Sequence, residues 1–311
     1  MSTYRILSLD GGGIRGIVTV ILLQRLNAES SLTGWLDSVD LIAGTSTGGL
    51  LALGLAYGLD LQVIHNLYEK KGNEIFDDSW LEDIVDLGRL IGSEYSNKSL
   101  ERELKTIFGQ ATLEELNHRV LVTAFDLDNE SSNPWSRKWK PKIFHNFPGP
   151  DSDGKELLYK VGLYTSSAPV YFPSVDGFID GMVYAANPSM CALAQSQDSR
   201  IPDKPSSSEV VLFSLGTGTS LFYIKGKYLN WGYAQWAKPL VKLVIDGTTG
   251  IADYQCRQIL GERYHRLAPI FPPGVSIPMD AVDQVPYMIG FAQEVNISET
   301  VKWLKKNWLK A

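Results

Sequence analysis

Hydrophobic residues predominate in several runs along the first sixty positions, and glycine-rich turns separate these runs. Residues 4–9 and 39–43 are apolar segments of strand length, and each precedes a longer apolar segment, residues 16–27 and 50–57. The glycines between them break the chain where each strand should end. Strands that alternate with buried helices predict a mostly parallel sheet covered on both faces. We therefore expect an α/β fold with three layers, α/β/α.

The same alternation continues to the C-terminus without an internal repeat or a linker-like segment, so we expect a single domain over residues 1–311. Further strands are predicted at 120–125, 142–147, 177–180, 209–215 and 264–267. Further helices are predicted at 61–71, 99–108, 156–166, 190–197, 280–294 and 298–310, and loops at 126–141, 149–154 and 199–208.

Residues 41–59 carry no charge and are long enough to span a membrane. Five glycines lie in this stretch, and they favour a strand, a tight turn and a buried helix over a transmembrane helix.

Composition indicates which partners and which cellular compartment to expect. The net charge is -6, which argues against nucleic acid as a partner. Cys191 and Cys256 lie in unrelated contexts and are interpreted as packed thiols of a reducing compartment. A charge at Asp10 comes too early for a secretory signal. We expect a cytoplasmic protein, with peripheral contact to membranes left open.

The stretch "DGGGIRG", residues 10–16, follows the first strand and contains the G-x-G-x-x-G spacing of dinucleotide-binding turns. Such a turn also needs an acidic residue at the end of the second strand, but Asp37 and Asp40 precede that strand. No lysine of a P-loop follows either glycine cluster. What remains is a set of backbone N–H groups at a helix N-terminus, which suits a developing oxyanion. A nucleotide-binding module stays as a weaker alternative.

The stretch "GTSTGG", residues 44–49, stands between the second strand and its helix. This is the context of a G-x-S-x-G nucleophile elbow, in which a strained turn presents a serine at the end of a strand. The motif predicts Ser46 as a nucleophile, although similar turns also occur as plain connections.

A serine nucleophile needs a base. Asp180 follows a short apolar strand and precedes Gly181, where its carboxylate is placed to reach the end of the sheet. A turn-initiating aspartate is the alternative interpretation. The histidines are His65, His118, His145 and His265. Only His265 follows Ser46 and Asp180 in the Ser, Asp, His order of α/β-hydrolases, but no turn signal near it would present its ring.

Together these motifs resemble the patatin-like phospholipases, a family of lipid acyl hydrolases. The resemblance is carried by "DGGGIRG", "GTSTGG", "TSSAPVYFPS" (165–174) and "DGMVYAANP" (180–188), with "SLGTG" (214–218) beyond them. It implies a catalytic dyad of Ser46 and Asp180 without histidine, and an oxyanion hole around Gly11, Gly12 and Gly13. Neither a cofactor nor a metal is implied. Residues from about 220 to 311 would be a family-specific helical elaboration.

The resemblance also assigns supporting roles. Arg15 would shape the glycine loop or meet a phosphate, and the remaining supporting positions are Gly16, Gly44, Gly48 and Gly181. One departure is Met182, because the family usually has glycine or alanine after Asp-Gly.

The implied chemistry is ester hydrolysis on an acyl lipid. Aspartate is a weak base in water, so burial should raise the pKa of Asp180. Ser46 would attack the ester carbonyl and water would hydrolyse the acyl-enzyme. Acyl transfer or thioester hydrolysis would use the same residues and is not separated by the sequence.

Two segments suggest contact with a lipid surface. Residues 221–236 interleave aromatic residues with lysines, and the C-terminal "TVKWLKKNWLK" places apolar residues along one helical face. Core or subunit contacts are the alternative for both.

Overall fold

A computed structural model describes residues 3–75, 93, 95–201 and 204–309 of the chain. Seven strands form one sheet, in which β4, β3, β2, β1, β6 and β7 are neighbours in this order and β5 pairs with β3. The strands are β1 (Tyr4–Leu9), β2 (Leu41–Thr45), β3 (Arg119–Asp126), β4 (Lys140–His145), β5 (Phe178–Asp180), β6 (Val210–Leu215) and β7 (Tyr264–Leu267).

The sheet is mostly parallel, as predicted. β1, β2, β3, β6 and β7 run in one direction, while β4 and β5 are antiparallel to β3. β2 and β6 are buried along their whole length and β1 is buried from Ile6 to Leu9, as central strands between two helical layers must be.

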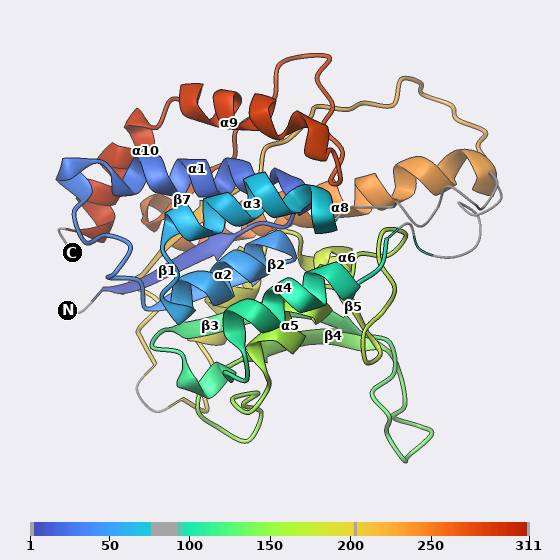
Figure 1. Cartoon of the computed structure of the whole chain (residues 1–311), viewed down its shortest axis with the longest axis horizontal. Coiled ribbons are helices and arrows are strands. Elements are labelled where there is room, and N and C mark those ends of the chain that lie inside the picture. The colour runs from blue at the N-terminus through green and yellow to red at the C-terminus, as the bar shows by residue number, and fades with distance from the viewer. Residues whose placement is uncertain (1–2, 76–92, 94, 202–203, 310–311) are drawn as a thin grey trace.

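Helices cover both faces of the sheet, which confirms the three-layer α/β/α prediction (Figure 1). One face packs against α1 (Gly16–Asn27), α2 (Thr47–Tyr57), α3 (Leu61–Ile75), α4 (Lys98–Phe108), α5 (Leu158–Ser166) and α9 (Val285–Glu294). The other face packs against α7 (Ser189–Ser196) and the C-terminal part of α8 (Tyr233–Leu260). The short helices α6 (Met182–Ala185) and α10 (Ser298–Trp303) contact α8 and β7 respectively.

Several predicted elements differ in detail. Residues 41–59 form β2, a turn and α2, and no helix in the described part of the chain is both long and apolar enough to cross a membrane. α10 ends at Trp303 and continues as a π-helical turn to Trp308; residues 202–203 of one predicted loop and residue 310 of the last predicted helix lie outside the described residues. Cys191 and Cys256 are free thiols.

The C-terminal part of the chain is built into the same fold. It supplies β7 at the edge of the sheet as well as α8, α9 and α10, so it is not purely helical. One cluster of buried side chains runs from Leu7 to Trp308. From this shared core we propose that the described residues form one domain, as predicted for residues 1–311.

Candidate active site

The site lies along one edge of β3, where β2 and β5 pair with successive parts of this strand. β2 is parallel to β3 and ends with Thr45 opposite Thr123, while β5 is antiparallel and ends with Asp180 opposite Ala124. The C-terminal ends of β2 and β5 therefore meet head to head beside consecutive residues of β3. This register brings Ser46, the residue after β2, next to Asp180.

Ser46 occupies a strained turn between β2 and α2. Its φ angle is +54°, in a region that non-glycine residues rarely adopt, and such a conformation costs about 1–3 kcal/mol. The turn also requires close backbone approach: a Cβ at Gly44 would lie 2.1 Å from the carbonyl oxygen of Gly48, and a Cβ at Gly48 would lie 2.2 Å from that of Leu9. Any side chain at position 44 or 48 would collide with the backbone, which explains why both residues are glycine. The geometry is that of a nucleophile elbow.

Threonines hold the elbow in place. The backbone N–H of Ser46 donates to Thr165 Oγ1 at 2.7 Å, and that hydroxyl in turn donates to the carbonyl of Thr123 at 2.7 Å. Thr45 Oγ1 lies 2.7 Å from Thr123 Oγ1 and 2.6 Å from the carbonyl oxygen of Ala185. The strained serine is thus fixed to β3, α5 and α6 at once.

Asp180 is completely buried, and the surroundings of its two oxygens differ. Oδ1 accepts the backbone N–H of Met182 at 2.8 Å, whereas Oδ2 makes no aligned hydrogen bond within the described residues. Burial raises the pKa of Asp180 to about 7, although hydrogen bonding by Ser46 and by the Met182 backbone opposes the increase. The serine hydroxyl is thus a close neighbour of the carboxylate.

The glycine loop lies against Ser46, but its amides are not all free. Gly11 packs so close that a Cβ there would be 3.3 Å from the Cβ of Ser46. Its N–H donates to the carbonyl of Ala186 at 2.9 Å, and the N–H of Ile14 donates to Met279 at 2.7 Å. Among the amides expected to bind an oxyanion, only those of Gly12 and Gly13 have no hydrogen-bond acceptor within the described residues.

A buried ion pair anchors the start of this loop. Arg266 on β7 donates through two guanidinium nitrogens to both carboxylate oxygens of Asp10, and it also donates to Ser214 Oγ at 2.6 Å. Both charged side chains are 8% exposed. Bidentate pairs of this kind fix geometry as well as charge, so β7 and β6 orient the residue before the glycines.

Arg15 ties the glycine loop to the "SLGTG" segment. Its Nε donates to the carbonyl of Gly12 at 3.2 Å, and its Nη1 donates to the carbonyl of Gly218 at 3.4 Å. These contacts fit the loop-shaping alternative expected for Arg15.

The other predicted glycines are also tightly enclosed. A side chain at any of them would collide with a neighbouring hydroxyl or carbonyl group. A Cβ would lie 2.2 Å from the nearest atom at Gly12, Gly13, Gly16 and Gly181. Met182, the departure from the family pattern, packs against Gly11 and lines the pocket described below.

None of the four histidines, all of which are described, lines this pocket. His265 lies on β7, three strands away from β2, where it stacks between Phe213 and Trp303 and contacts Thr300 Oγ1 at 2.9 Å. His118 contacts the carbonyl of Val39, and His65 contacts Gln24. The Ser, Asp, His order of the sequence therefore does not form a triad.

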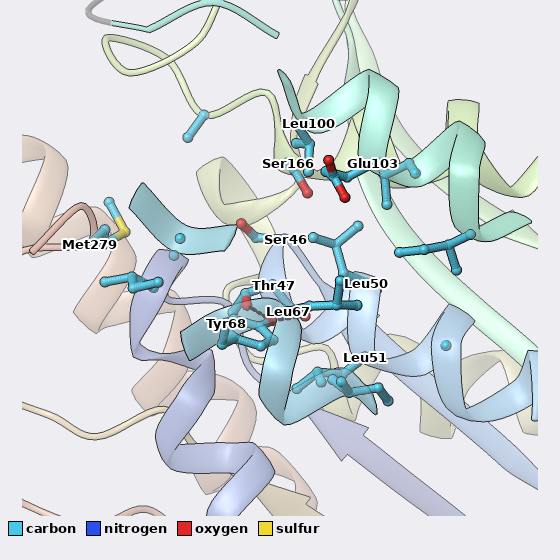
Figure 2. Close-up of a pocket in the computed structure, with 18 of the residues that line it drawn as sticks. Ser46, Thr47, Leu50, Leu51, Leu67, Tyr68, Leu100, Glu103, Ser166 and Met279 are labelled. Carbon is cyan, nitrogen blue, oxygen red and sulfur yellow. Dashed lines mark hydrogen bonds between the residues drawn. The ribbon is translucent and has the colours of Figure 1, made fainter. Parts of the chain in front are cut away.

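An apolar pocket opens at Ser46 and continues between helices. Figure 2 shows Leu50 and Leu51 following Ser46 along α2, with Tyr68 of α3 and Leu100 of α4 facing them. Further lining residues are aliphatic or aromatic: Leu59, Ile64, Leu104, Ile107, Phe108 and Phe172. Such a pocket fits a hydrocarbon chain whose polar end lies at the serine.

Sequence reasoning missed Thr165, Thr123 and Arg266. Thr165 lies in a quoted motif, but nothing in the sequence assigns its hydroxyl to the elbow. Arg266 and Asp10 are 256 positions apart, and no local pattern predicts their contact.

The chain is similar to several known proteins. A family model described as "Patatin-like phospholipase" matches residues 7–193. A "cGAMP-activated phospholipase" of Pseudomonas aeruginosa is 30% identical over 289 residues, covering 91% of this chain and 83% of that protein. "Patatin-like protein 1" of Oryza sativa subsp. indica is 28% identical, covering 80% and 68% respectively. Among solved structures, VipD from Legionella pneumophila covers 94% of this chain and 67% of its own, with a TM-score of 0.43 and 12% identity.

Proposed function

This chain belongs to the patatin-like phospholipase family, and from this premise we propose that it hydrolyses fatty-acyl ester bonds of phospholipids through an acyl-enzyme on Ser46. Asp180 is the general base, in an activity of the phospholipase A or lysophospholipase type. The observation that carries the proposal is the head-to-head meeting of β2 and β5 on β3, which sets Ser46 beside a buried carboxylate.

The first half of the reaction acylates the serine. Ser46 Oγ attacks the ester carbonyl carbon while its proton passes to Asp180. The N–H groups of Gly12 and Gly13 stabilise the negative charge on the carbonyl oxygen. When the tetrahedral intermediate collapses, the alcohol leaves with the proton from Asp180, and the fatty acyl group stays on Ser46.

The second half restores the enzyme. Asp180 accepts a proton from a water molecule as that water attacks the acyl-enzyme. Collapse of the new intermediate breaks the bond to Ser46, and the proton returns to Ser46 Oγ. Fatty acid is released, so each cycle consumes one ester and one water.

The surroundings of Asp180 support its role as a base. In water a carboxylate is too weak a base to assist a hydroxyl at neutral pH. Burial raises the pKa of Asp180 to about 7, so its charged form is a far better proton acceptor while still populated near neutrality.

The pocket beyond Ser46 supports an acyl lipid as the substrate. It begins at Ser46 and runs along α2 to Phe108, and Glu103 is the only charged side chain among its described lining residues. A fatty-acyl chain would gain about 0.8 kcal/mol for each CH₂ group that it buries there. We assign the acyl chain to this pocket and the head group to the side of the glycine loop.

The proposal is tested by product analysis with a mixed phospholipid extract. Mass spectrometry should find free fatty acid with the wild type and none with Ser46→Ala or Asp180→Asn. A fluorophosphonate probe should label Ser46. His265→Gln should retain activity, since that side chain lies three strands away. Acyl products on an alcohol or thiol acceptor, without free fatty acid, would instead indicate an acyltransferase.

One relative's name suggests a condition for this assay. The P. aeruginosa protein is named as activated by cGAMP, so each reaction is to be run with and without this cyclic dinucleotide. Hydrolysis that requires Ser46 in either condition supports the proposal, and its absence in both contradicts it.

A further inference from the structure

One segment, residues 221–251, extends away from the core of the protein. From Leu221 to Ile251, every side chain whose exposure is described is at least partly exposed. The segment contains a loop and the N-terminal half of α8, which projects beyond the sheet (Figure 1). Only from Ala252 onward does α8 pack on the core, where Cys256 and Leu260 are buried. We call residues 221–245 the projecting segment.

The projecting segment exposes many large apolar side chains. The most exposed positions include Tyr223 at 86%, Tyr228 at 95% and Tyr233 at 98%, and α8 adds Leu240 at 52% and Val241 at 59%. A helix that is apolar around its circumference is normally buried in protein or in lipid. Contiguous exposed apolar residues of this extent mark an interaction surface.

Its charge differs from that of the whole protein. The sequence of the projecting segment contains four lysines and no acidic residue, in a chain whose net charge is -6. Asp246, which follows the segment, forms an ion pair with Lys242 at 3.4 Å, so Lys225 and Lys227 carry the charge argument. Lys242 lies over the ring of Phe222, with Nζ 4.3 Å from the centroid, so the loop folds back on α8. Lysine stems and tyrosine rings are apolar with polar tips, the combination that suits the headgroup boundary of a bilayer.

Both ends of the projecting segment lie at the glycine loop of the site. Before it, the carbonyl of Gly218 accepts a hydrogen bond from Arg15. After it, the charge of Asp246 acts on the same guanidinium: burial lowers the pKa of Arg15, and Asp246 opposes this effect. Val170, 61% exposed, lies between the pocket-lining residues Ala168 and Tyr171. The projecting segment thus starts and ends near the glycine loop, whose Gly13 and Ile14 line the Ser46 pocket.

We propose that the projecting segment is a docking surface for an anionic lipid bilayer, which places the mouth of the Ser46 pocket against the headgroups. This inference rests on the proposed function for its biological purpose, but binding to lipid can be measured without catalysis. Apolar side chains supply affinity and the lysines supply preference for negative headgroups.

The first test measures co-sedimentation of the full chain with vesicles of phosphatidylglycerol and phosphatidylethanolamine. The variant Tyr223→Ser/Tyr228→Ser removes two rings that contribute little to folding because they are almost fully exposed. Binding should fall roughly tenfold for each ring removed. The matched control is Trp135→Ser/Trp139→Ser, at 98% and 71% exposure in the loop between β3 and β4, far from α8 in Figure 1. Unchanged binding of the tyrosine variant, or an equal loss in the control, would overturn the proposal.

A second test measures the preference for negatively charged vesicles. Lys225→Ala/Lys227→Ala should weaken binding to phosphatidylglycerol vesicles by roughly fivefold per lysine and leave binding to phosphatidylcholine vesicles unchanged. An equal loss on both vesicle types would overturn the charge-based part of the assignment.

Activity on two substrates separates docking from catalysis. On a water-soluble short-chain ester, the Tyr223→Ser/Tyr228→Ser variant should match the wild type, whereas hydrolysis of vesicle phospholipid should fall with binding. Equal losses on both substrates would place these residues in the site and overturn docking. If the wild type hydrolyses neither substrate, the proposed function fails, and the co-sedimentation result still decides the docking surface.

A second copy of the chain is the competing occupant. Sedimentation velocity without lipid should give the same mass for the wild type and the tyrosine variant. A wild-type dimer that the variant dissociates, together with unchanged vesicle binding, would assign the surface to self-association instead.

Discussion

Replacing Asp180 by asparagine should stabilise the fold above neutral pH while removing hydrolytic activity. In the wild type, the buried carboxyl prefers to be neutral, because burial raises its pKa from an ordinary 3.8 to about 7. The unfolded chain releases this proton near pH 3.8, so between these values the unfolded state holds fewer protons than the folded state. Stability contributed by Asp180 is therefore present below pH 3.8 and is lost as the pH rises through about 7.

The magnitude follows from the two pKa values. Each pH unit between them costs the wild type about 1.4 kcal/mol of unfolding free energy, which gives a total of roughly 4 kcal/mol above about pH 7. Asparagine has no charge to lose, and its Oδ1 can still accept the backbone N–H of Met182. The stability advantage of Asp180→Asn over the wild type should therefore grow by about 2–3 kcal/mol between about pH 5 and about pH 8.

Urea denaturation followed by tryptophan fluorescence at these two pH values measures the difference. Asp37→Asn serves as the matched control, since Asp37 is exposed and its replacement removes the same formal charge from the surface. Other carboxylates titrate identically in both proteins and cancel in the comparison.

The result that would refute the reasoning is a constant difference between Asp180→Asn and the wild type across this pH range. It would mean that the carboxylate is ionised at little cost in the folded protein, so that burial does not make it a stronger base. A pH-dependent gain in Asp37→Asn of the same size would equally remove the argument, because it would not be specific to the buried site.

Three further predictions concern the same site. On a soluble ester, kcat/KM should fall about tenfold per pH unit below about pH 7 and level off above it, because only ionised Asp180 accepts the proton; a flat profile from about pH 5 to about pH 8 would contradict this. Gly54→Leu should shift preference toward shorter acyl chains in a chain-length series, because a Cβ there already meets Leu59 at 3.3 Å in the pocket wall; equal losses for all lengths would argue against an acyl pocket. Arg266→Leu should lower the free energy of unfolding, measured by urea denaturation, by about 3–5 kcal/mol, because it leaves the Asp10 carboxylate buried and unpaired. Adding Asp10→Asn to this variant should recover much of the loss. No recovery would show that the unpaired charge is not the cause.

The sequence predicted best what is encoded locally. β1 and β2 are short, mostly apolar segments, and the glycines that each turn requires follow within a few residues. Local sequence was therefore sufficient to locate the loop and the elbow. The strand predicted at 39–43 lies at Leu41–Thr45, because apolar runs do not mark where hydrogen-bonded pairing starts.

Contacts between distant parts of the chain could not be predicted. The pairing of β5 with β3 depends on a three-residue strand, and its register decides whether Asp180 meets Ser46. No helix was predicted at α8 (Tyr233–Leu260). Its N-terminal half has no buried face and so lacks the amphipathic periodicity by which helices are predicted, and Pro239 interrupts its pattern. The free amides of the glycine loop depend on which carbonyls lie opposite them, which no local motif specifies.

β3 contributes no side chain to the proposed dyad, yet its pairing sets the spacing between Ser46 and Asp180. Thr45 and Asp180 are paired with consecutive β3 residues, so the distance between alcohol and acid is determined by one peptide step and not by the connecting segments. Evolution can lengthen or shorten those connections freely, whereas a one-residue insertion within β3 would turn its neighbours to opposite faces and separate the pair. Length variation among relatives should therefore concentrate in the connections and spare this strand.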